Sequence, residues 1–239
     1  MIAASVAAWH DERVNVTRAD WNGEAQARMS VGRIIEGPDC VAEGAAWLAA
    51  RDAGMARAVA AVDEVPLRLR EDGFAQLLSA IVSQQVSVAS ANAIWGRMQA
   101  AGLVTPGALA DASDEALREV GLSRQKMRYS RALAEAGIDY DGLRRLPDAE
   151  VVKMLTAVPG VGVWTAEIYA MFSLGRADVF APGDLALQEA ARVLYELEER
   201  PKERALREMA EARWRPWRAV AARVLWAYYR VAKDREGIR

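Results

Sequence analysis

The 239-residue sequence predicts an all-α protein: a two-lobed helical body preceded by a short N-terminal extension. Apolar residues recur at helical spacing from Val41 onward, and helix caps and first-turn prolines separate the periodic segments. No alternation of apolar and polar residues long enough for a sheet core follows residue 40. We therefore expect an extension over 1–40 and a body over 41–239, with the functional cleft between the lobes.

The first 40 residues differ from the rest of the chain. They show no helical period and carry two short runs of β-forming residues, Val14–Thr17 and Val31–Ile35, so we expect a tail or a reduced β region. Met1–Ala8 is apolar but short and lacks a basic leader, unlike a signal peptide. No stretch approaches the roughly 18–20 apolar residues of a membrane span. The sequence predicts a soluble cytoplasmic protein with no membrane partner.

The expected helices begin and end at recognisable signals. Phe74–Val82 has apolar residues at i, i+3, i+4, i+7 and i+8, the spacing of an amphipathic helix. The helix that begins at Ser123 is expected to stop at Gly137, a glycine of the C′ type. Caps and prolines predict three further helix starts, at Thr105-Pro106, Ser113 and Pro147-Asp148.

Composition limits the available chemistry. Cys40 is the only cysteine, which excludes an intramolecular disulfide, a four-cysteine iron–sulfur cluster and a cysteine-based zinc site. His10 is the only histidine, which argues against a histidine metal centre and a Ser-His-Asp triad. We expect no cofactor, and catalysis by carboxylates, lysines, tyrosines or hydroxyls. The net charge of −2 does not indicate a nucleic-acid binder. However, residues 202–235 carry ten Lys/Arg against four acids. This excess indicates either a basic face or, more commonly, a solvated helix surface.

A tight connection between two helices is the most informative motif. A helical pattern ends before Pro159, and Gly160 and Gly162 bracket a single apolar residue before the helical pattern resumes. Two glycines allow unusual backbone conformations and leave the main chain open to a ligand. The amides and the following helix N-terminus then point at a phosphate, a contact that reads backbone rather than sequence. The alternative for Gly-x-Gly alone is a plain helix–helix turn. The residues expected to contact a nucleic-acid backbone are Val158, Gly160, Val161, Gly162 and Thr165.

Asp184 is the candidate catalytic carboxylate. It lies 22 residues after Gly162, directly after Pro182-Gly183, and it precedes a helical run. Taken alone, it is expected to be an N-cap that accepts hydrogen bonds from the first helical amides. Capping also fixes the position of a carboxylate, so the structural and catalytic roles are compatible. Asp178 and Glu167 are weaker candidates.

The two motifs, Val-Pro-Gly-Val-Gly-x-x-Thr-Ala at 158–166 and Pro-Gly-Asp at 182–184, resemble those of the helix-hairpin-helix-GPD superfamily of DNA glycosylases. Over roughly Val65–Tyr229 the sequence is similar to the AlkA-type 3-methyladenine DNA glycosylase II family. Further matching segments are Leu78–Val88, Gly121–Lys126 and Trp214–Arg218, followed by Trp226. The resemblance implies a monomeric base excision repair enzyme that flips alkylated bases such as 3-methyladenine and 7-methylguanine out of double-stranded DNA. It would then hydrolyse the N-glycosidic bond.

The resemblance also assigns the base pocket. Trp164 and Trp226 match its aromatic lining, and stacking on indoles favours a cationic alkylated base by ~0.5–2 kcal/mol per contact. Ile168 and Leu185 replace two tyrosines of the family, which predicts a less aromatic and more open pocket. Bifunctional relatives such as endonuclease III carry a nucleophilic lysine where this chain has Trp164. We therefore expect no lyase activity, with water as the attacking group. Trp214, Trp217 and Tyr228 are expected to be packing residues.

The segment around Gln85 matches the residue that the family wedges into the duplex, with Gln84 beside it. That family position holds an apolar residue, and Gln85 departs from it. Either the helix ends near Ser83 and exposes both glutamines, or Gln85 is buried and hydrogen-bonded. In relatives the hairpin carbonyls, here 158–162, hold a monovalent cation, although no side chain in this sequence demands one. The resemblance implies no other metal.

Two alternatives remain open at this stage. The first is a glycosylase for another lesion or for a mismatched base, because such relatives share the hairpin and the aspartate. The second is a non-catalytic helix-hairpin-helix protein that binds DNA without cutting it. Substitution of Asp184 separates the second alternative from an enzyme, because a binding module needs that carboxylate only for stability.

Overall fold

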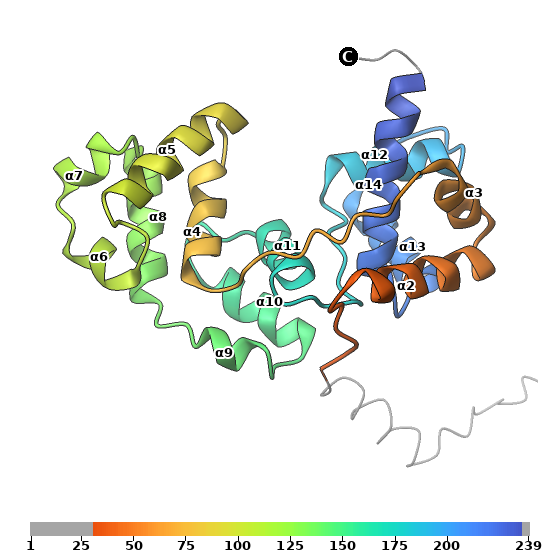
Figure 1. Ribbon diagram of the computed structural model, residues 1–239, viewed down its shortest axis with the longest axis horizontal. Helices are drawn as coiled ribbons and strands as arrows, with labels where there is room; N and C mark the ends of the chain where they lie inside the picture. The colour runs from red at the N-terminus through yellow and green to blue at the C-terminus, as the bar shows by residue number, and fades with distance from the viewer. Residues whose placement is uncertain (1–30, 236–239) are drawn as a thin grey trace, which may run out of the picture. The chain divides into compact units, whose positions relative to one another are not determined.

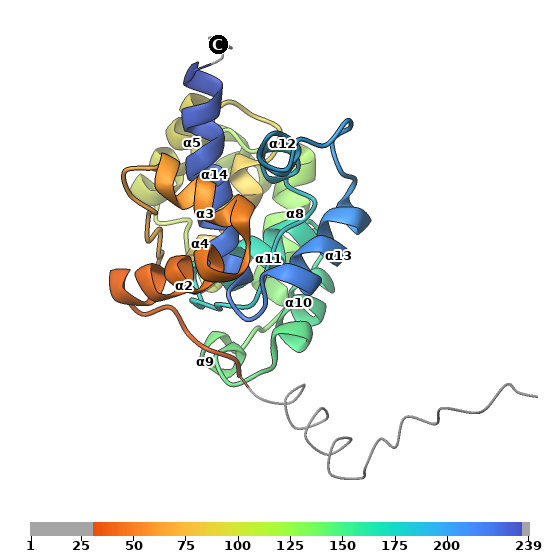
Figure 2. The same cartoon turned by 90° about the vertical axis from the view of Figure 1, so that its right-hand side faces the viewer.

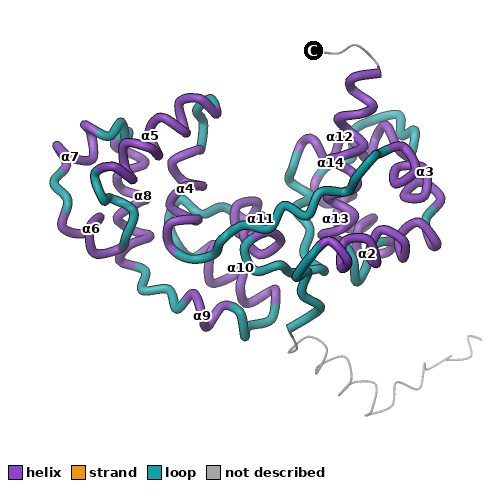
Figure 3. Tube along the Cα trace, in the orientation of Figure 1, coloured by secondary structure: helices purple, strands orange, loops and turns teal. Residues whose placement is uncertain are grey.

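The computed structural model describes residues 31–235, so the expected signals at Met1–Ala8 and Val14–Thr17 lie outside the described residues. Within the described range no strand is present, and the β pairing consists of one isolated bridge between Ile34 and Arg176 (Figure 3). The predicted all-α fold class is confirmed. None of the described helices is both long and apolar enough to cross a membrane.

Helices follow one another through the described chain (Figure 1). In order they are α2 (Pro38–Arg51), α3 (Ala53–Ala61), α4 (Phe74–Ser83), α5 (Val88–Ala100), α6 (Pro106–Asp111), α7 (Asp114–Glu119), α8 (Arg124–Glu135), α9 (Tyr140–Leu143), α10 (Asp148–Thr156), α11 (Val163–Phe172), α12 (Leu185–Leu194), α13 (Glu203–Arg213) and α14 (Arg218–Arg235).

The local signals read from the sequence mark the helix ends correctly. The side chains of Thr105, Ser113 and Ser123 each accept a hydrogen bond from a first-turn amide, of α6, α7 and α8 respectively. α8 ends shortly before Gly137, whose φ of 58° lies in the left-handed region that glycine tolerates. The amphipathic helix expected at Phe74–Val82 is α4, and its five apolar positions are buried. These boundaries were predictable because each signal is local to its helix.

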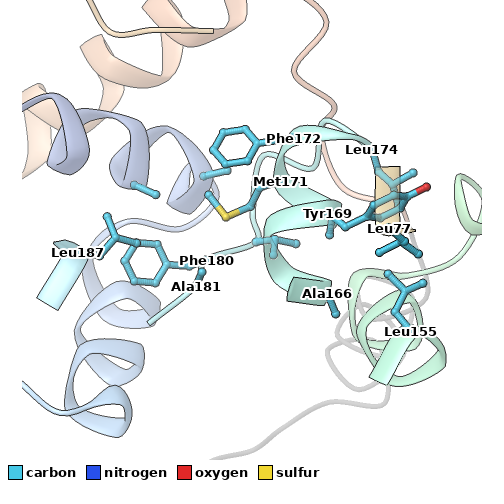
Figure 4. Packing of buried hydrophobic residues seen from close by; sticks show 14 of the residues in the cluster. Leu77, Leu155, Ala166, Tyr169, Met171, Phe172, Leu174, Phe180, Ala181 and Leu187 are labelled. Atoms are coloured by element: carbon cyan, nitrogen blue, oxygen red, sulfur yellow. The ribbon is translucent and has the colours of Figure 1, made fainter. Parts of the chain in front are cut away.

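The helices pack in two groups joined through α11. One group contains α2, α3, α12, α13 and α14, with α14 against α2, α3 and α12 (Figure 2). The other contains α4, α5, α6, α7 and α8. α11 packs against α10, and seven of its ten residues are buried: Tyr169 and Phe172 lie in a core that also includes Leu77 and Leu187 (Figure 4). Because α11 is anchored on several sides, it places the residues of its first turn firmly.

Residues 31–40 pack with the helical body. Ile35 is buried, its amide donates to Gly175 O at 2.6 Å, and α2 already begins at Pro38. These contacts place the described end of the expected 1–40 extension against the body. The division into 1–40 and 41–239 itself stays a prediction, since residues 1–30 are not described. As expected for packing residues, Trp214 and Trp217 are buried, and Tyr228 packs partly buried against the core.

Candidate active site

Asp184 caps the N-terminus of α12. Its Oδ1 accepts from the amides of Ala186 (2.9 Å) and Leu187 (3.0 Å), as the sequence predicted for an N-cap. A side chain of α12 also holds the turn before Asp184, because Gln188 Nε2 donates to Pro182 O at 2.8 Å. The carboxylate is therefore held at one place while Asp184 remains partly accessible.

Two indoles from different helices meet this carboxylate. Trp164, in the first turn of α11, donates from Nε1 to Asp184 Oδ2 at 3.1 Å. Trp226, on α14, donates from Nε1 to Asp184 Oδ1 at 3.2 Å. Trp164 is 46% exposed, whereas Trp226 is partly buried and lies 5.7 Å from Phe172 between ring centroids. The two tryptophans predicted to stack on a base thus also act as hydrogen-bond donors to the predicted catalytic residue.

A cavity of about 210 Å³ opens beside Trp164, between α4 and α11. Trp164, Ile168 and Phe172 line it from α11, so the structure brings two of the predicted pocket residues together. Leu185 does not line this cavity; it is 61% exposed at the start of α12. Trp226 is likewise outside the lining and reaches Asp184 from α14.

Polar residues that the sequence did not predict for the site also line this cavity. Gln76, Ser79 and Ser83 project from α4, and Arg70 comes from the connection that precedes it. Their spacing of i, i+3 and i+7 on α4 is a detectable signal, because it marks a polar stripe beside the apolar one. Arg70 offers no such signal, because its position depends on how the connection folds back onto α11.

The predicted hairpin connects α10 to α11. Val161 N donates to Val158 O at 3.0 Å and closes the turn. The side chains of Val158, Val161 and Thr165 are buried and anchor the turn in the core. The amides available to a ligand therefore belong to a rigid turn.

The two hairpin glycines serve different needs. Gly160 has a φ of 93°, and a Cβ there would lie 2.4 Å from Tyr129 Cγ, so packing as well as conformation requires glycine. Gly162 has an extended conformation, and a Cβ there would have no atom within 4 Å. The expectation of an open main chain therefore holds at Gly162, whereas at Gly160 the space is filled by Tyr129.

The two glutamines after α4 also differ. α4 ends at Ser83, the first of the two arrangements expected, and Gln85 is exposed with a left-handed φ of 56°. Gln84 is not free: its Nε2 donates to the hairpin carbonyl Gly160 O at 2.9 Å. The expectation that both glutamines are exposed is therefore wrong for Gln84. Gln85 alone projects from the turn between α4 and α5.

The weaker carboxylate candidates are engaged elsewhere. Asp178 accepts hydrogen bonds from Arg215 (3.0 Å) and Arg218 (2.7 Å). Glu167 is buried and pairs with Arg207 at 3.0 Å; burial raises the pKa of Glu167, and Arg207 opposes that rise. Asp184 is therefore the candidate that combines an accessible position with neighbouring aromatic groups.

The basic run over residues 202–235 is not a free basic face. Five of its arginines pair with carboxylates: Arg204, Arg207, Arg213, Arg215 and Arg218. Arg223 is fully buried and donates to main-chain carbonyls. The sequence left two interpretations open, a basic face for nucleic acid and a solvated helix surface. For most of the run these ion pairs favour the solvated helix surface.

Comparisons with known proteins agree on one family. A family model described as "HhH-GPD superfamily base excision DNA repair protein" matches residues 78–216. DNA-3-methyladenine glycosylase 1 of Schizosaccharomyces pombe is 30% identical over 179 residues, 71% of this chain and 78% of that protein. The crystal structure of a DNA-3-methyladenine glycosidase from Bacillus halodurans is similar with a TM-score of 0.73 and 34% identity, covering 84% of this chain and 94% of that one. The S. pombe 3-methyladenine DNA glycosylase in complex with abasic DNA gives a TM-score of 0.66 and 31% identity, covering 77% and 95%.

Proposed function

Because the chain belongs to the HhH-GPD superfamily of base excision DNA repair proteins, we propose that it is a monofunctional DNA N-glycosylase for alkylated bases. Its substrates would be bases of the 3-methyladenine and 7-methylguanine type in double-stranded DNA, and its product an abasic site. The observation that carries the proposal is the Asp184 carboxylate, fixed by the first amides of α12 and met by the indoles of Trp164 and Trp226.

The reaction follows from that placement. A base flipped out of the stack enters the site beside Trp164, where indole stacking favours the delocalised positive charge of an alkylated purine. As the glycosidic bond lengthens, its electron pair goes to the departing base, which leaves neutral, and positive charge grows on the sugar. The Asp184 carboxylate stabilises that charge. A water then bonds to C1′ and gives up its proton, for which Asp184 is the acceptor.

We expect no lyase step. Trp164 occupies the position at which bifunctional relatives carry a lysine, and an indole cannot form a Schiff base with the sugar. Lys126 is buried near α4, and burial lowers the pKa of its amine. Its Nζ, however, donates to Val82 O and not to Asp184, so Lys126 does not replace the missing lysine. Trapping with borohydride should therefore yield no covalent protein–DNA adduct.

The remaining roles are part of the same proposal. Gln85, exposed in the turn after α4, would wedge into the duplex, with Gln84 holding that turn to the hairpin. The hairpin would contact the DNA backbone through Gly162 and the N-terminus of α11, and its carbonyls would accept a monovalent cation. The protein would act as a monomer on chromosomal DNA in the cytoplasm, in the cleft between the two helix groups.

The decisive experiment measures free bases released from methylated duplex DNA by the wild type and by Asp184→Asn. We expect the wild type alone to release 3-methyladenine or 7-methylguanine, and the strands to stay intact until alkali is added. Release of a different base from a lesion panel would support the alternative of another specificity. No release from any lesion, with duplex binding unchanged in Asp184→Asn, would show a binding module instead.

A further inference from the structure

Arg68, Arg70 and Arg230 gather beside Trp226 and its neighbour Phe172. Arg68 lies with its guanidinium 5.6 Å from the Trp226 ring centroid, and Arg70 lies 5.8 Å from that of Phe172. Arg230 follows Trp226 by one helical turn on α14 and is exposed. None of the three forms an ion pair with a carboxylate among the side chains that the structure describes, residues 31–233. By contrast, most arginines of α13 and the start of α14 are paired.

The main chain holds two of these arginines in place. In the connection between α3 and α4, Leu67 O accepts from Arg223 Nε at 2.9 Å, and Arg70 N donates to Phe172 O at 2.9 Å. Arg68, between these two anchors, has a left-handed φ of 52°. A residue other than glycine pays on the order of 1 kcal/mol or more for this conformation. The connection therefore keeps Arg68 over Trp226 against a local backbone preference.

The charges around the cluster are predominantly positive. Arg223, fully buried over Phe172, is satisfied by carbonyls alone, and burial lowers the pKa of Arg223 to about 10. The pKa of Arg68 is lowered mainly by burial and further by the positive charges of Arg230 and Arg70. Among acids on the same connection, Asp72 is paired with Arg144, and Asp63, Glu64 and Glu71 are exposed without an ion pair to the cluster. An anion placed on the cluster would relieve this repulsion.

We propose that Arg68, Arg70 and Arg230 form a second binding site for phosphodiester groups of the substrate DNA, beside Trp226 and Phe172. It is separate from the hairpin, which leads directly into Trp164 and would hold the backbone at a first site. The inference rests on the proposed function, because it takes DNA as the ligand. A nucleotide that is flipped rotates about its own backbone, so an enzyme gains from fixing the phosphates on both sides of it. Guanidinium groups suit this task because their planar donors match phosphate oxygens.

The test compares two triple variants with the same loss of charge. Arg68→Gln/Arg70→Gln/Arg230→Gln removes the cluster, and Arg118→Gln/Arg145→Gln/Arg204→Gln removes three exposed arginines that have acidic partners. The affinity for a duplex with a tetrahydrofuran abasic analogue is measured over a series of salt concentrations. In a plot of log K against log salt concentration, each lost phosphate contact makes the negative slope shallower by ~0.9. The loss of two or three contacts should therefore make the slope of the cluster variant shallower by about 1.8–2.7. The control should keep the wild-type slope, and equal slopes for wild type and cluster variant would overturn the proposal.

A second measurement distinguishes contact from long-range attraction. Single neutral methylphosphonates are placed in turn at each position flanking the abasic analogue. One or two of them should weaken binding by the wild type but not by the cluster variant. If every position weakens both proteins equally, the cluster does not contact a phosphate and the proposal fails. Should the triple variant not fold, Arg230→Gln alone gives the same readout, since this residue is exposed on α14. Neither assay needs base release, so a failure of the proposed glycosylase activity is recognised separately.

Discussion

The indole of Trp164 donates to Asp184 Oδ2 at 3.1 Å, and no other donor to Oδ2 is present among the described residues. Oδ1, in contrast, already accepts from two amides and from Trp226. The two oxygens of the carboxylate are thus held unequally. Oδ1 is held at the start of α12 by three donors, whereas the exposed indole of Trp164 alone holds Oδ2 and so fixes the orientation of the carboxylate plane.

This difference predicts the effect of Trp164→Phe. Phenylalanine keeps an aromatic face for stacking but removes the donor to Oδ2. A hydrogen bond to a charged group contributes ~1.5–3 kcal/mol, so the single-turnover rate of 7-methylguanine release should fall about ten- to hundredfold. Trp47→Phe, on α2 and away from Asp184, is the matched control and should keep the wild-type rate. A wild-type rate for Trp164→Phe would show that the indole only stacks.

Trp226→Phe should cost less than Trp164→Phe. The Trp226 bond of 3.2 Å goes to Oδ1, which retains the amides of Ala186 and Leu187 when the indole is lost. The carboxylate then keeps its position, and the expected loss in single-turnover rate is less than about tenfold. The ranking of the two variants, measured on one methylated duplex, checks the inference. The reverse ranking would mean that α14, rather than α11, orients the catalytic group.

How far the sequence predicts this protein depends on whether a signal is local. The N-cap role of Asp184 and the helix ends at Ser123 and Gly137 are properties of a few neighbouring residues, and all were predictable. The indole bonds were not, because they join α11 and α14 to α12 across the fold. Arg68 is a similar case: nothing near it in the sequence marks a left-handed residue other than glycine.

The glutamines show the same limit. The sequence leaves two arrangements open for Gln85, and the structure follows the one in which α4 ends at Ser83. The bond from Gln84 to Gly160 O could not be predicted, because it spans 76 residues of sequence. Likewise, the sequence leaves a basic face and a solvated helix surface open for residues 202–235, and the pairs of Arg207 with Glu167 and of Arg218 with Asp178 could not be predicted because they join distant segments.

Substitutions of Asp184 should separate capping from catalysis. Asparagine is also a good N-cap, so Asp184→Asn keeps an acceptor for the amides of Ala186 and Leu187 and should be more stable than Asp184→Ala, although its amide nitrogen cannot accept from Trp164. Asp184→Ala removes the cap and should destabilise the protein by ~1–2 kcal/mol. Both variants should lose base release. Urea denaturation followed by circular dichroism measures the stability, and equal stabilities for the two variants would contradict the capping role.

The two hairpin glycines should respond in opposite ways to alanine. In Gly160→Ala the new Cβ must accommodate both a φ of 93° and Tyr129 Cγ at 2.4 Å, so we expect a loss of about 2–4 kcal/mol in the free energy of unfolding. In Gly162→Ala the Cβ enters open space at an ordinary φ of −82°, so stability should change by less than about 1 kcal/mol.

For correctly folded protein, DNA binding should be weakened more by Gly162→Ala than by Gly160→Ala, the reverse of their effects on stability. A methyl group at Gly162 stands on the open side of the hairpin, where a phosphate would approach the amides of α11, and it should weaken duplex binding about tenfold or more. Below its melting temperature, Gly160→Ala should bind more tightly than Gly162→Ala, because its added methyl group faces Tyr129. Melting curves and duplex affinities of both variants check the pair. If Gly162→Ala binds DNA like the wild type, the backbone does not approach the hairpin at this glycine, and the phosphate contact must lie elsewhere on the turn.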